Sequence, residues 1–169
     1  VMLFQSIKNN SLQFNTNDSS SILNSFFAAQ TKLLEIYPDH EDRIHFEIDK
    51  ADLKINKSHL ELVLFELIDN ALKFSPIDSK INITGAPFND ALYSLTIADQ
   101  GIGFSEEQLE QIGPAQQFDR EKYEQQGLGL GLYLSKFIIK NYDGLFNINS
   151  TVNVGTSINI LLPLTASKP

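Results

Sequence analysis

The chain has 169 residues, of which 42% are hydrophobic, and this size and composition suit one globular domain with a hydrophobic core. Its formal net charge of -8 disfavours nucleic-acid binding and general electrostatic attraction to anionic membranes. The sequence has no cysteine, so disulfides and thiolate metal sites are excluded, and it has no apolar run near the roughly 20 residues of a membrane-spanning helix.

No internal repeat or low-complexity linker divides the chain. We expect a linker, or the tail of a preceding helix, at residues 1–11, one folded domain at 12–164, and a short tail at 165–169. A short strand is predicted where Leu12 and Phe14 alternate with polar residues.

The first long helix is predicted to start from a cap within residues 18–21 and to end near Tyr37, before Pro38. A strand follows where Ile44, Phe46 and Ile48 alternate with polar residues.

A second helix is predicted from Ser58 to about Phe74, with Ser58 and Glu61 as a capping box. Residues 80–86 and 92–98 then form a predicted hairpin around an Asn-Asp turn.

A short helix is expected next, with Ser105 as its cap and Gln108 as the partner of that cap. The last helix is predicted over 129–141, and a closing hairpin over 145–151 and 156–162. Because the strands come in hairpins, we predict an α/β two-layer sandwich: a mixed, mostly antiparallel sheet covered on one face by helices.

The predicted second helix carries three polar residues at a spacing that gives them a common face. Glu66, Asn70 and Lys73 lie at positions i, i+4 and i+7. A carboxylate and an amide oxygen suit a hydrated Mg²⁺, and a lysine suits phosphate. A solvated helix face with an incidental ion pair explains the same pattern.

Asp99, Gly101 and Gly103 follow a predicted strand directly. A carboxylate at a strand end can accept a hydrogen bond from an adenine amino group, and glycines allow the backbone to approach a ligand. Asp and Gly are also common in ordinary capped turns.

Gly127, Gly129 and Gly131 lead into the last helix. Exposed N–H groups at such a helix start favour an anion, although close helix packing through small residues is the alternative. The polar stretch 113–126 before them has few apolar residues and is predicted to be a lid over phosphate.

The order of these motifs resembles the catalytic domain of histidine kinases, within the GHKL superfamily of ATPases. The resemblance covers roughly residues 12–163, and residues 112–127 look most like kinases of the hybrid type that carry a receiver domain. It implies ATP and Mg²⁺ as ligands of a cytoplasmic histidine protein kinase in two-component signalling.

The resemblance also implies roles for individual residues. Asn70, together with Glu66, would hold Mg²⁺. The residues that would contact phosphate are Lys73, Arg120, Lys122, Gly127, Gly129 and Gly131. The residues that would surround adenine are Phe74, Asp99, Gly101, Gly103, Leu132 and Thr156. Glu66, Lys73 and Arg120 would be catalytic.

Glu66 departs from the family pattern, because most histidine kinases have Asn there and the ATP-hydrolysing relatives have Glu. An ATP-driven conformational switch and a nucleotide-binding module without chemistry are therefore alternatives.

His40 lacks the sequence context of a phosphoacceptor, so the acceptor histidine is expected on a separate dimerisation domain, with a receiver domain as a further partner. The domain itself is expected to be a monomer without nucleic-acid or membrane contact.

Overall fold

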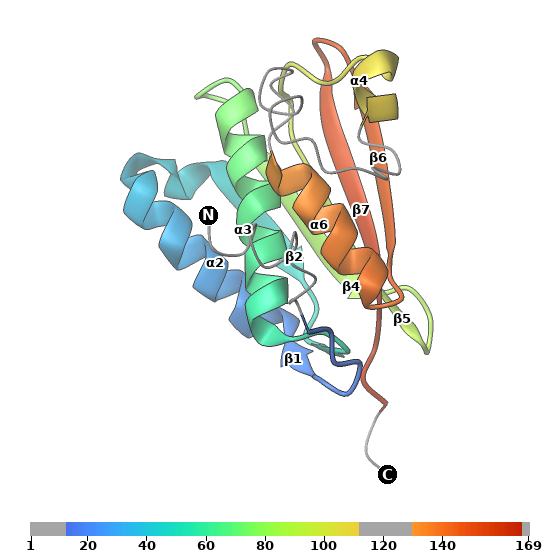
Figure 1. Cartoon of the computed structure of the whole chain (residues 1–169). Coiled ribbons are helices and arrows are strands. Elements are labelled where there is room, and N and C mark those ends of the chain that lie inside the picture. Colours follow the sequence, from blue (N-terminus) through green and yellow to red (C-terminus); the bar gives the residue numbers. More distant parts are fainter. Residues whose placement is uncertain (1–12, 112–129, 167–169) are drawn as a thin grey trace.

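The computed structural model describes residues 13–111 and 130–166 of the chain. Its main sheet has five strands in the order β2-β4-β5-β7-β6, and helices α2, α3 and α6 lie together on one face of it (Figure 1). β2 pairs in parallel with β4, and the other neighbours pair antiparallel. The predicted mixed sandwich is thus confirmed.

The helical elements are α2 (Ile22–Ile36), the 3-10 helix η1 (Pro38–Arg43), α3 (Lys57–Phe74), α4 (Glu106–Gln111) and α6 (Leu130–Asn141). The strands are β1 (Ser20–Ser21), β2 (Ile44–Ile48), β3 (Asp52–Leu53), β4 (Ile81–Pro87), β5 (Leu92–Ala98), β6 (Leu145–Thr151) and β7 (Gly155–Pro163). Within the described ranges, no helix is long and apolar enough to cross a membrane.

The core lies between the sheet and the helices, because alternate residues of the central strands point to the helical side. Tyr93, Leu95 and Ile97 of β5 are at most 2% exposed, while the residues between them are only half-buried. β5 and β7 pair in register, so the same alternation continues across the sheet, with Ile158 opposite Ile97. This alternation fixes which face of the sheet carries the helices.

Two local predictions are wrong. Phe14 is not in a strand; its ring packs on His59 and Tyr142, at centroid distances of 5.3 and 5.4 Å. Helix α3 is capped by Asn56, whose side chain accepts from the Ser58 N–H at 2.9 Å, so the predicted capping box with Glu61 does not form. Asn56 can cap because its backbone is extended there, one residue before the helix begins.

The small sheet formed by β1 and β3, which pair antiparallel over two residues each, was not predicted from the sequence. The capping box at the short helix α4 is confirmed: the Gln108 N–H donates to Ser105 Oγ at 3.3 Å, and the Ser105 N–H donates to Gln108 Oε1 at 2.9 Å.

Candidate functional site

A pocket opens between α3, the ends of β5 and β7, and the start of α6. About 410 Å³ of empty space lies between its walls, including the part open to solvent. Most of the walls are apolar, and the polar side chains among them are those of Asn70, Asp99 and Thr156. The full set of lining residues is Leu67, Asn70, Ala71, Phe74, Ile97, Asp99, Ile102, Gly103, Phe104, Leu132, Thr156 and Ile158. A mostly apolar pocket with few polar groups is typical of a small-molecule site.

Asp99 follows β5 directly and is held from two sides. Its Oδ1 accepts from the Gly101 N–H at 2.8 Å and from the Thr156 N–H at 3.3 Å. Burial raises the pKa of the Asp99 carboxyl, and these two N–H groups oppose that rise. The two hydrogen bonds fix the direction of the carboxylate while it remains part of the pocket wall.

The loop after Asp99 is tied to the β6–β7 hairpin through Ser150. The Phe104 N–H donates to Ser150 Oγ at 2.8 Å, and Ser150 Oγ lies 2.9 Å from Thr156 Oγ1. Gly103 has a φ of 66°, and a Cβ there would lie 2.1 Å from the Thr151 carbonyl oxygen. Only glycine fits this close crossing of two chains without strain.

The carboxylate of Glu66 lies against the first turn of α6. A Cβ built on Gly131 would be 2.0 Å from Glu66 Oε2, so the carboxylate occupies the space that a side chain would take. Burial raises the pKa of Glu66, and the negative charge of Asp69 adds to the rise while Lys73 opposes it. A half-buried carboxylate with a raised pKa suits a proton acceptor.

Glu66, Asn70 and Lys73 do not all face the pocket. Asn70 lines it, but the Lys73 ammonium donates to Asp69 Oδ2 at 2.5 Å. Asp69 is only 6% exposed, and the ion pair with it raises the pKa of Lys73. No pattern in the sequence singled out Asp69, because an acidic residue beside a predicted polar stripe is ordinary on a helix.

The pocket brings together six of the predicted site residues: Asn70, Phe74, Asp99, Gly103, Leu132 and Thr156. Gly101 borders it through its hydrogen bond to Asp99. Four predicted phosphate contacts, Arg120, Lys122, Gly127 and Gly129, and the predicted lid at 113–126 lie outside the described residues. Of the apolar walls, sequence reasoning predicted Phe74 and Leu132 but missed the others, although Ile102 and Phe104 stand within the same Asp-Gln-Gly-Ile-Gly-Phe motif as Asp99.

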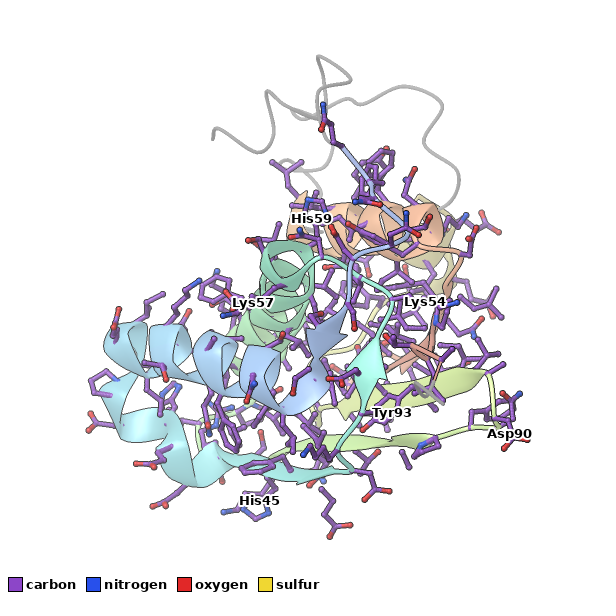
Figure 2. The ribbon with its side chains drawn as sticks, turned by 90° about the horizontal axis from the view of Figure 1, so that it is seen from below. His45, Lys54, Lys57, His59, Asp90 and Tyr93 are labelled. Carbon is purple, nitrogen blue, oxygen red and sulfur yellow. The ribbon has the colours of Figure 1, made fainter. Side chains whose placement is uncertain are left out.

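None of the chain's three histidines lines the pocket. His45 lies on the sheet face away from the helices, whereas His59 lies in the helical layer, bonded to the Tyr142 hydroxyl at 2.7 Å (Figure 2). His40 belongs to η1, and its ring stacks on Tyr37. Within the described ranges, no three His, Cys, Asp or Glu side chains cluster as a metal site.

The chain also matches a known protein family over most of its length. Residues 55–166 match the family model described as "Histidine kinase-, DNA gyrase B-, and HSP90-like ATPase". The match covers most of the chain, including every residue of the pocket. The chain belongs to this family, and its relatives and structural neighbours are histidine kinases.

Two relatives of the chain are histidine kinases of known name. Over 136 residues, 76% of the chain, it is 31% identical to the signal transduction histidine-protein kinase ArlS of Staphylococcus haemolyticus. Over 116 residues, 68% of the chain, it is 30% identical to histidine protein kinase DivJ of Caulobacter vibrioides. The chain spans only 29% and 19% of the lengths of these proteins.

Among solved structures, the mycobacterial sensor histidine kinase MprB matches with a TM-score of 0.66 and 19% identity. That alignment covers 88% of this chain and 97% of the other, so it establishes the fold over most of the chain. The chain therefore has the architecture of a histidine-kinase catalytic domain.

Proposed function

We propose that this chain binds ATP with Mg²⁺ and transfers the γ-phosphate to a histidine of a separate domain. The observation that carries the proposal is the carboxylate of Asp99, fixed at the wall of an apolar pocket in a chain of this family. A fixed acceptor among apolar walls favours adenine, whose amino group donates while its faces contact apolar side chains. Phe74 and Leu132 supply such apolar surface.

The residues near the pocket fit a magnesium ion that is held mainly by the nucleotide. Glu66 and Asn70 offer hard oxygen donors one helical turn apart on α3. The described residues contain no cluster of three His, Cys, Asp or Glu side chains that could hold a metal, and a site with few protein ligands suits Mg²⁺, because this ion keeps several water and phosphate ligands. Magnesium bound in this way supplies charge neutralisation along the phosphate chain.

Catalysis by this chain would then rest on positioning. Asp99 would orient the base, Asn70 would help to hold the metal, and Glu66 would take a proton from the attacking group. Lys73, and Arg120 and Lys122 from the predicted lid, supply positive charge for phosphate.

The acceptor histidine is assigned to another domain, because no histidine of this chain lines the pocket. The proposed partners are a dimerisation domain with the phosphorylated histidine and a receiver domain, in the cytoplasm.

Hydrolysis of ATP is the second candidate, and Glu66 favours it, since a carboxylate with a raised pKa can activate water as well as an imidazole. Mixing the domain with the histidine domain of the same protein and labelled ATP separates the two. Acid-labile phosphate on the histidine domain is the result expected for a kinase. Release of inorganic phosphate alone, at the same rate with and without that domain, would favour the hydrolytic switch.

A further inference from the structure

We propose that Asp69 is a positioning residue that holds Lys73 outside the pocket, so that nucleotide phosphates must compete with a buried carboxylate for this lysine. The inference rests on the proposed function, because it concerns the phosphate end of the same site. It adds Asp69 and Tyr37, two residues outside the pocket, to the residues that determine nucleotide affinity.

Both oxygens of Asp69 are occupied by donors from two different elements. Oδ2 accepts from the Lys73 ammonium at 2.5 Å, and Oδ1 accepts from the Tyr37 hydroxyl at 2.8 Å. Tyr37 caps the C-terminal end of α2, and its ring stacks on His40 with centroids 5.2 Å apart and planes 2° from parallel. The carboxylate is therefore held both by its own helix and by a fixed aromatic side chain.

Of the two ion-pair partners, Lys73 is the one free to move. Asp69 is 6% exposed and is bonded to Tyr37 at the end of α2, whereas the Lys73 side chain is 52% exposed. Lys73 follows Asp69 by four residues and Asn70 by three, so both are its neighbours on the helix surface. A swing of its long side chain from Asp69 toward Asn70 brings the ammonium to the pocket.

Moving Lys73 away from Asp69 costs free energy, and this cost lowers the affinity for phosphate. When Lys73 leaves, Asp69 remains buried, and the Tyr37 hydroxyl is then its one remaining side-chain donor among the described residues. A buried carboxylate that loses its counterion is destabilised. Phosphate therefore gains less from Lys73 than it would from a lysine without a partner, whereas a ligand without phosphates is unaffected.

The test is the ratio of ATP affinity to adenosine affinity, measured by calorimetry in Mg²⁺ for the whole chain. Asp69→Asn removes the competing charge, so the ratio should rise roughly three- to tenfold. Tyr37→Phe keeps the stacked ring but leaves Lys73 as the sole strong donor to Asp69, so the ratio should fall roughly two- to fivefold. Opposite changes at two residues outside the pocket are not expected from general destabilisation.

Two controls separate release of Lys73 from a simple change of charge. Glu61→Gln removes a carboxylate from the same helix that is paired with Lys32 and Lys57, at 3.5 and 3.8 Å, and should leave the ratio unchanged. In a Lys73→Met background, Asp69→Asn should also leave the ratio unchanged, because no lysine remains to be released.

An unchanged or lower ratio in Asp69→Asn, or an equal rise in the Lys73→Met background, would overturn the inference alone. If Asp69→Asn does not fold, as judged by thermal unfolding, Tyr37→Phe decides, and an unchanged or higher ratio would overturn the inference. A wild-type chain that binds neither ATP nor adenosine would overturn the proposed function, and this inference with it.

Discussion

The carboxylate of Glu66 occupies the space in which a side chain of residue 131 would lie. A Cβ on Gly131 would be 2.0 Å from Glu66 Oε2 and 3.1 Å from Glu66 Cβ. The helix that carries the proposed base and the first turn of α6 are thus in contact through a glycine.

We expect Gly131→Ala to displace the Glu66 carboxylate, because the far end of a flexible side chain yields more readily than two packed helices. Turnover of ATP should fall about as far as in a variant without the base, while affinity for adenosine changes little. Steady-state kinetics and calorimetry on the same preparation check both expectations. Wild-type turnover in Gly131→Ala would contradict the functional importance of this contact.

Glu66→Gln preserves the shape of the side chain and removes the proton acceptor. A general base typically contributes about 10²–10⁴-fold in rate, so both phosphotransfer and slow hydrolysis should decrease by a factor in that range while ATP binding persists. Transfer of labelled phosphate to the histidine domain is the measurement. Transfer at the unmutated rate would rule out the role of base and leave Glu66 as a ligand of metal-bound water.

Asn70→Ala should abolish the enhancement of ATP binding by Mg²⁺, because Asn70 lines the pocket and we propose its amide oxygen as a metal donor. Calorimetry with and without Mg²⁺ measures this enhancement, and adenosine serves as the control ligand. If ATP and adenosine lose affinity equally, Asn70 supports the pocket wall and not the metal.

Asp99→Asn should weaken ATP binding by roughly 1–3 kcal/mol, or about 5–150-fold, because a donor replaces the acceptor for the adenine amino group. Calorimetry with ATP measures the loss, and competition between ATP and GTP measures the preference of the pocket for adenine over guanine. Equal affinities of the unmutated protein for the two nucleotides would remove the basis for the assignment.

The same substitution should have the opposite effect on the stability of the nucleotide-free protein. Burial raises the pKa of Asp99 above the ordinary 3.8, so the folded state binds this proton more tightly than the unfolded chain. Stability is therefore lost as the pH rises from 3.8 through the raised pKa. Over that pH range, denaturant unfolding should show that the free energy of unfolding of Asp99→Asn rises relative to that of the wild type. The amide can replace the carboxylate in the fold, since it retains an oxygen for the Gly101 and Thr156 N–H groups.

Arg43→Met should destabilise the end of α3, which carries Phe74. The buried guanidinium donates to the carbonyls of Pro76 and Ser79, at 2.9 and 3.1 Å. We expect a loss of about 2–4 kcal/mol in the free energy of unfolding, because these carbonyls lose their charged donor.

Chemical denaturation measures that loss. Lys80→Met is a matched control, since Lys80 also donates to a carbonyl, that of Asp42, but is exposed, and it should stay within about 0.5 kcal/mol of the wild type. An equal effect of the two substitutions would show that burial of Arg43 does not matter.

The sequence by itself determined the long elements and the polar end of the pocket. Helix α3 and the β4–β5 hairpin follow from periodic apolar residues, and the boundaries at Ser75-Pro76 and at the Asn-Asp turn follow from backbone chemistry. Asp99 and Gly103 were identified from their Asp-x-Gly-x-Gly spacing after a strand together with the order of the other motifs, because this spacing alone is also common in ordinary turns.

Only the tertiary structure decided which of several neighbouring side chains faces the pocket. Asn56 replaced Ser58 as the cap of α3, and Lys73 turned toward Asp69, although helical spacing alone placed it with Asn70. Helical spacing predicts the direction of a side chain only to within about one helical position. Which neighbour the side chain contacts then depends on a hydrogen-bond donor from another element. Here that donor is the hydroxyl of Tyr37, which holds Asp69 32 residues away along the chain.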